Sequence, residues 1–118
     1  MNPPQSESPG ILERVRLGSG LGDADRPRLL GDLEGLAHHL AGWRPDEVDL
    51  EVTVKDRGSA HQRVTLNAWL PGWPHLVATS SDVDLDHAVR EARKELIRQI
   101  EGERDRQRPR RGRSKPPR

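Results

Sequence analysis

Hydrophobic residues recur along this chain at two different spacings, and each spacing predicts one type of element. Alternation of apolar and polar residues predicts four strands, within residues 13–20, 48–55, 63–70 and 75–80. Apolar residues three or four positions apart predict two helices, over about residues 23–43 and 84–101. The predicted order of elements is therefore β-α-β-β-β-α.

Each predicted element has one apolar face, which we expect to form the core. In the strands these positions are Val15, Leu17, Val48, Leu50, Val52, Val54, Val64, Leu66, Ala68, Leu70, Leu76 and Ala78. In the last helix they are Leu85, Ala88, Val89, Ala92, Leu96 and Ile100. A helical crossover makes the first two strands parallel, and short turns make the later pairs antiparallel. We predict an α+β fold, a two-layer sandwich whose two helices cover one face of a four-stranded sheet.

The first predicted helix contains two glycines, Gly31 and Gly35. Each weakens a helix by roughly 1 kcal/mol relative to Ala. Asp23 or Asp25 can cap its start, and Pro27 suits its first turn. We expect one continuous helix that depends on packing against the rest of the protein.

Composition divides the chain into a body and two flanking segments. At 118 residues, one domain is expected. Residues 1–12 are rich in Pro and Ser and are expected to be disordered, and the domain is expected over residues 13–102. Residues 103–118 hold eight basic and two acidic residues, a balance of +6, so the overall charge of +1 leaves −5 for residues 1–102. A basic, disordered tail on an acidic body is typical of proteins that bind a polyanion.

Several classes of protein are disfavoured by what the chain lacks. It has no Cys, its five His residues have no metal-binding spacing, and neither a phosphate-binding loop nor a nucleophile elbow occurs. We therefore expect no enzyme, no metal or other cofactor and no small-molecule substrate. The first ten residues do not form a secretory signal, and no apolar run is long enough to cross a membrane. A cytoplasmic protein without membrane contact is expected.

The last predicted helix carries a basic face. Arg90, Lys94 and Arg98 are four residues apart, with Arg93 beside them, and two glutamates line the neighbouring face. One interpretation is a solvated helix with Glu–Lys and Glu–Arg pairs, each worth a few tenths of a kcal/mol. The other is contact with phosphates, favoured because the helix continues into the Arg-rich tail. The tail alone could also serve only solubility.

Two of the three tryptophans, Trp69 and Trp73, flank a Pro-Gly turn. They could stack on nucleic-acid bases, or they could pack on one another across the hairpin. Alternation places Trp69 on the sheet face opposite the core. We expect the two rings to form a local hydrophobic clasp.

Two short motifs frame the last predicted helix. It opens with D-[hydrophobic]-x-x-A-[IV], matched by Asp84, Leu85, Ala88 and Val89. It ends in L-x-[RK]-Q-[LI], matched by Leu96, Arg98, Gln99 and Ile100. With the strand, the Pro/Gly turn and the strand that precede this helix, the chain resembles the ribosome hibernation-promoting factor and ribosome-associated inhibitor family, also called sigma-54 modulation proteins. The resemblance is to the short form and covers roughly residues 13–101.

The resemblance implies a double-stranded-RNA-binding-like fold that binds the small ribosomal subunit and its rRNA between head and body. Family members silence idle ribosomes under stress or in stationary phase. Arg26 and Arg98 match basic positions of the family, and Lys94 lies one position before another. Three other such positions hold Asp32, Gly35 and Glu95 here. The C-terminal dimerisation domain of long members is expected to be absent.

The candidate RNA-contacting residues combine the matched positions, the basic helix face and the tail. They are Arg26, Arg90, Arg93, Lys94, Arg98, Arg104, Arg106, Arg108, Arg110, Arg111 and Arg113. The leading hypothesis is a translation inhibitor that binds the small ribosomal subunit through rRNA phosphates. The alternative is a diverged regulatory module that binds other RNA or protein. A small-molecule enzyme on an α+β scaffold is a third, disfavoured by the missing catalytic cluster.

Overall fold

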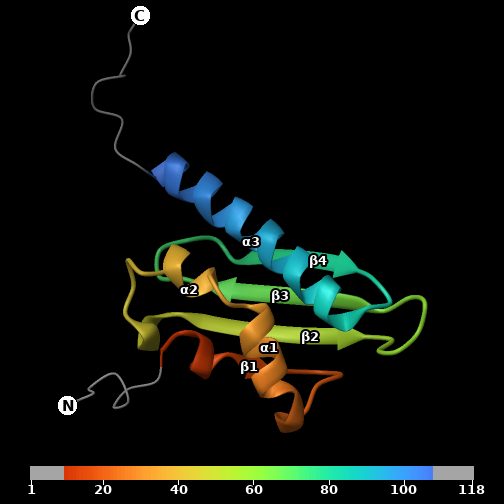
Figure 1. The fold of residues 1–118 in the computed structure, drawn as a ribbon. Coiled ribbons are helices and arrows are strands. Elements are labelled where there is room, and N and C mark those ends of the chain that lie inside the picture. Colours follow the sequence, from red (N-terminus) through yellow and green to blue (C-terminus); the bar gives the residue numbers. More distant parts are fainter. Residues whose placement is uncertain (1–9, 108–118) are drawn as a thin grey trace, which may run out of the picture.

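Four strands form a single sheet in the order β1-β2-β3-β4 in the computed structural model, which describes residues 10–107 (Figure 1). The strands are β1 (Arg16–Leu17), β2 (Asp49–Lys55), β3 (Arg63–Trp69) and β4 (Leu76–Ser81). β1 pairs with β2 in parallel, and the other two pairs are antiparallel. The predicted order and direction of all four strands are confirmed.

Three α-helices lie on one face of this sheet (Figure 1). They are α1 (Arg26–Asp32), α2 (Leu36–His39) and the long α3 (Leu85–Gln107), which packs across β3 and β4. Short 3-10 turns occur at η2 (Leu12–Arg14), η3 (Asp23–Asp25) and η4 (Pro45–Glu47). The two-layer α+β architecture with helices on one face is confirmed.

The core lies between the sheet and the helices. The inward positions predicted for the three long strands and for α3 are all buried, and α1, α2 and the loops beside them add Leu29, Leu33, Leu36 and Leu40. At the first strand the prediction holds for Val15, which is buried, whereas Leu17 is only partly buried. Alternation and helical spacing therefore identified most of the core correctly.

The prediction of one continuous helix over residues 23–43 is wrong. The chain forms α1 and α2 with a turn between them, and Gly35 at the start of α2 has φ +95°. A left-handed backbone is accessible to Gly and unfavourable for other residues, so Gly35 is where the helix can change direction. The change of direction allows Leu33 and Leu36 to be buried together. Packing thus outweighs the continuous helical spacing.

Helix α3 is longer than predicted. It continues through Gly102 to Gln107, so the first five residues of the expected tail belong to the helix, and its last turn holds the buried Glu103. Residues 108–118 lie outside the described part of the chain. At the other end, Ile11 is buried in the core, so the domain begins before the expected residue 13.

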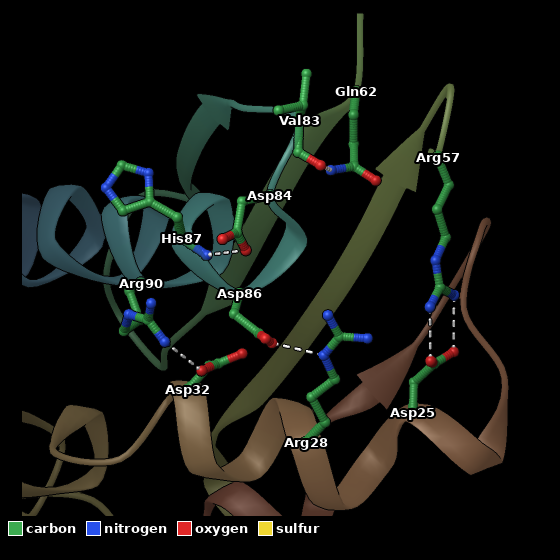
Figure 2. A network of polar contacts seen from close by, with 10 residues as sticks. All are labelled: Asp25, Arg28, Asp32, Arg57, Gln62, Val83, Asp84, Asp86, His87 and Arg90. Atoms are coloured by element: carbon green, nitrogen blue, oxygen red, sulfur yellow. Dashed lines mark hydrogen bonds and ion pairs between the residues drawn. The ribbon is translucent and has the colours of Figure 1, made fainter. Parts of the chain in front are cut away.

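The start of α3 is tied to the β2–β3 loop by the buried Gln62. Its side-chain amide donates to the carbonyl oxygens of Asp82 and Val83 at 2.8 and 3.1 Å, and its Oε1 accepts from the Gly58 N–H at 2.9 Å. Figure 2 shows Gln62 pointing toward Val83, with Asp84 beside the His87 N–H in the first turn of α3. A buried amide with three hydrogen bonds is well satisfied, so it holds this end of the helix in place.

Gly20 lets the chain pass closely over β2 after β1. Its φ is +85°, and a Cβ at this position would lie 2.2 Å from the Val54 carbonyl oxygen. The approach is fixed by the hydrogen bond from the Val54 N–H to the Ser19 carbonyl at 2.8 Å. A side chain at Gly20 would therefore collide with the backbone of β2.

We expect Gly20→Ala to lower the free energy of unfolding by about 2 kcal/mol or more, because a left-handed backbone is strained and the new methyl group meets a fixed carbonyl. Urea denaturation measures this. Gly31→Ala is the matched control, because Gly31 lies in α1 with open space around a Cβ. This change should raise the free energy of unfolding by up to about 1 kcal/mol. A Gly20→Ala protein as stable as the original would contradict this account.

Candidate nucleic-acid interface

Two arginines of the predicted basic face contact the end of α1, and the Arg90 side chain is still 44% exposed. The Arg90 guanidinium contacts the Asp32 carboxylate, with Nη1 to Oδ1 at 3.0 Å (Figure 2). Arg93 donates to the carbonyl oxygens of Asp32 and Glu34 at 3.1 and 3.0 Å. Those carbonyls lie at the end of α1, where backbone acceptors lack helical partners. Arg90 and Arg93 therefore hold α1 against α3.

Asp32 is a buried carboxylate with an acidic neighbour, Asp86, and a basic neighbour, Arg90, both on α3. Burial raises the pKa of Asp32 to about 6, and the adjacent Asp86 carboxylate adds to this, while Arg90 opposes it. Its Oδ2 atom is buried and accepts no hydrogen bond from the described residues. The buried Asp32 carboxyl is therefore harder to ionise than an exposed one. The Arg28 guanidinium, 2.6 Å from Asp86, keeps the pKa of Asp86 below its usual range.

The predicted contact residue Arg26 is also engaged within the fold. It donates to the Val15 carbonyl oxygen at 2.8 Å, next to β1. Nearby, Arg57 binds Asp25 through two hydrogen bonds of 2.9 and 2.8 Å (Figure 2). This bidentate pair keeps the pKa of Asp25 far below its usual range. The start of α1 is therefore fixed by arginines that contact groups within the fold.

Three predicted cations of α3 do point outward, and each has an acidic partner three positions earlier. Lys94 contacts Glu91 at 3.1 Å, Arg106 contacts Glu103 at 2.6 Å, and Arg98 contacts Glu95. The side chains of Lys94, Arg98 and Arg106 are 60%, 72% and 69% exposed. The Lys94 and Arg98 pairs are exposed and contribute only about 0–1 kcal/mol, so a phosphate can replace their carboxylates, whereas Glu103, the partner of Arg106, is buried.

Arg104, on the last turns of α3, is used to hold α2. Its guanidinium donates to the His39 carbonyl oxygen at 2.7 Å and contacts Glu101 at 3.2 Å. It also lies 5.9 Å from the ring centroid of Trp43, within reach of a cation–π contact. Arg104 is therefore a structural residue in this fold.

The predicted contact residues thus separate into three groups. Arg26, Arg90, Arg93 and Arg104 bind elements of the fold. Lys94, Arg98 and Arg106 are exposed in acid–base pairs along α3. Arg108, Arg110, Arg111 and Arg113 lie outside the described residues. The candidate interface is the second group together with the basic residues that follow it in the chain, and we call it the α3 surface.

The expected clasp between Trp69 and Trp73 is wrong. Trp69 stacks on His75, with ring centroids 4.6 Å apart and planes inclined by 8°. Trp73 instead packs edge-on against Trp43, at 4.9 Å and 89°, beside the core. Trp69 follows the outward side of β3, whereas the turn after Leu70 carries Trp73 to the other side of the sheet. The two tryptophans therefore belong to different surfaces.

The outward face of the sheet holds two cations that the sequence analysis did not select. Lys55 and Arg63 are directly opposite one another in the β2–β3 register and are exposed. Within residues 10–107 neither makes an ion pair or hydrogen bond through its side chain. The alternation that identified the core also places both on this outward face. Neither residue lies on the last helix or in the basic tail, where the clustering of cations in the sequence is densest.

The chain shares its fold with a solved structure of low sequence identity. The N-terminal domain of Protein Y from Thermus thermophilus has a TM-score of 0.58 and 24% identity, over 75% of this chain and 96% of that chain. A ribosomal subunit interface protein from Coxiella burnetii has a TM-score of 0.48 and 17% identity, over 77% and 97%. No protein-family model and no curated protein matches the chain. The Protein Y comparison confirms the fold that the sequence resemblance implied.

Two kinds of feature are absent from the part of the chain that the structure describes. Residues 10–107 contain no group of three or more His, Asp or Glu side chains arranged to hold a metal ion. Within the same range, none of the helices has the length and apolar character needed to span a bilayer.

We expect Asp32→Asn to become stabilising relative to the original chain as the pH rises. Because the pKa of Asp32 is raised to about 6 in the folded state, the stability that its protonated form provides is complete below about pH 4 and is lost as the pH rises through 6. Asn keeps an oxygen for Arg90 and stays neutral. Urea denaturation at pH 4.5 and 7.5 should show the difference moving in favour of Asn by about 1–2 kcal/mol. A difference independent of pH would contradict the raised pKa.

We expect Arg93→Ala and Lys94→Ala, changes of equal charge at adjacent positions, to differ in stability. Arg93→Ala leaves two backbone carbonyls at the end of α1 without donors and should cost about 1–2 kcal/mol. Lys94→Ala removes only an exposed pair and should cost less than about 0.5 kcal/mol. Thermal and urea unfolding measure both. Equal losses would show that Arg93 does not hold α1.

Proposed function

We propose that this protein associates with the ribosome, binding the small subunit through rRNA phosphates and holding idle ribosomes silent under stress. The observation that carries the proposal is the agreement of two independent likenesses. The motifs of the last helix resemble the hibernation-promoting factor family, and the fold is that of the Protein Y N-terminal domain. A protein of this kind acts by occupying a surface, so it requires no catalytic group.

Charge distribution supports a specific mode of contact. Residues 10–107 contain 14 basic and 18 acidic residues, whereas residues 108–118 contain six basic residues and no acidic one. A net acidic body is repelled by RNA at long range, so the basic end must supply the attraction. The outward cations of α3 then meet phosphates by exchanging their glutamate partners. The α3 surface is therefore the proposed contact.

The acidic body also supports a second candidate function. Asp32, Gly35 and Glu95 stand where the hibernation family has basic residues, and Asp32 accepts the Arg90 and Arg93 contacts instead. When such positions make contacts within the fold instead of facing RNA, the chain is suited to another RNA or to a protein partner. In that case it would act as a regulatory module away from the ribosome.

Sedimentation through a sucrose gradient separates these two candidates. At low salt the protein should travel with purified small ribosomal subunits, whereas a non-ribosomal module would stay at the top of the gradient. Ending the chain after Gln107 should weaken binding and make its dependence on salt shallower, because six cations are removed. Undiminished binding would assign contact to the body alone.

Two charge variants of equal size test the α3 surface itself. Lys94→Gln with Arg98→Gln should weaken subunit binding, because it removes two exposed cations. Glu91→Gln with Glu95→Gln should strengthen it, because the same cations lose their internal partners. Each pair should change affinity about 3- to 10-fold in opposite directions, measured at fixed salt by co-sedimentation. Changes in the same direction would show that α3 does not face the RNA.

A further inference from the structure

The outward face of the sheet is a second surface, which meets α3 at the edge strand β4, where Val77 and Thr79 line one hollow together with Arg98. All the helices lie on the other side, so this face is uncovered within the described residues (Figure 1). Its side chains come from the outward positions of β2, β3 and β4 and from Arg16 of β1. An uncovered face on a sheet whose other face is fully packed is available to a partner.

Stacked rings occupy one end of this surface. Trp69 and His75 lie nearly parallel, and the His75 ring is held by a hydrogen bond of 2.9 Å to the Asn67 side chain. His75 is exposed, so a further flat ring can stack on its outer face. The Arg16 guanidinium lies 5.4 Å from the Trp69 ring centroid and is held by Asp49 at 2.8 Å. The rings are therefore fixed in position before any ligand arrives.

Uncompensated positive charge occupies the other end. Lys55 and Arg63 are neighbours across β2 and β3 without an acidic partner among residues 10–107, and like charges placed so closely repel one another. A bound anion would relieve that repulsion. The distance along the strands between this pair and Trp69 is about 20 Å, from six residues at about 3.3 Å each.

A row of hydroxyl groups crosses the sheet between the two ends. Thr53, Thr65 and Thr79 are paired across β2, β3 and β4, and they share the outward face because they alternate with the buried Val52, Leu66 and Ala78. Hydroxyl groups donate readily to phosphate and sugar oxygens. The surface thus offers an aromatic end, where Arg16 is paired with Asp49 and Glu51, then a polar middle and a cationic end.

We propose that the outward sheet face binds a short segment of single-stranded RNA, with a base stacked on His75 and phosphates at Lys55 and Arg63. Unpaired bases expose the flat faces that such rings contact, whereas a duplex hides them. The cation pair matches a phosphate backbone and would repel a basic peptide. This inference does not depend on ribosome association, because it concerns the purified protein and a free strand.

Fluorescence anisotropy with a labelled mixed-sequence hexaribonucleotide tests the proposal on the full chain. His75→Ala, at an exposed position, should weaken binding by about 5-fold or more, because stacking on a ring is lost. Lys55→Gln with Arg63→Gln should lower the slope of log affinity against log salt by about 1.4, from two phosphate contacts. Lys94→Gln with Arg98→Gln removes the same charge from the α3 surface, so His75→Ala should weaken binding by the same factor with and without this change.

Amide shifts in an NMR titration with the same hexamer locate the strand. Shifts along β3 and β4 around Asn67 and Thr79 are expected. Two results would overturn the proposal: unchanged affinity in both the His75→Ala and the Lys55→Gln/Arg63→Gln proteins, or shifts confined to α3 and the residues after it. Either would assign RNA contact to the α3 surface and leave the sheet face for a protein partner. Subunit sedimentation is a separate measurement, so either function can fail while the other stands.

Discussion

The contact of Arg90 and Arg93 with the end of α1 is the constraint on which the helix layer depends. α1 has seven residues and α2 has four, lengths at which isolated helices are not stable in water. Their leucines pack on the sheet, but packing alone leaves the carbonyls of Asp32 and Glu34 without donors. The two arginines supply those donors from α3, and Arg104 does the same for His39 at α2. One long helix thus holds two short ones in place.

This constraint explains why the basic face of α3 is not simply an RNA-binding face. A cation on a helix can serve a phosphate or an internal acceptor, and the neighbouring elements decide which. Asp32, at a position that is basic in the hibernation family, draws Arg90 inward. The cations that remain outward are paired with glutamates one turn earlier, and the proposed long-range attraction to RNA comes from the six basic residues after Gln107. In the two proposals, the sheet face contacts RNA by stacking on a base, and α3 contacts RNA through its positive charges.

Local patterns predicted the layers of this fold better than its contacts. The alternation of apolar residues in β2 and β3 and their helical spacing in α3 identified the core. An element that is buried on one face has apolar residues at regular intervals in the sequence. The break at Gly35 and the extension of α3 past Gly102 depend on tertiary packing, which spacing does not report. The group that each arginine contacts lies up to 65 residues away in the sequence, and the separation of Trp69 from Trp73 depends on a single turn. The sequence therefore identified the cations of the candidate site, but not the groups that each of them contacts.

Ultraviolet cross-linking of the protein to small-subunit RNA, with the attached peptides mapped by mass spectrometry, tests the central claim most directly. The account predicts cross-links in the residues after Gln107, in the outward side of α3 around Arg98, and at Trp69 or His75 on the sheet. It predicts none at Arg90 or Arg93, which are occupied within the fold. Cross-links concentrated on α1, α2 and these two arginines, or the absence of any cross-link to small-subunit RNA, would contradict it.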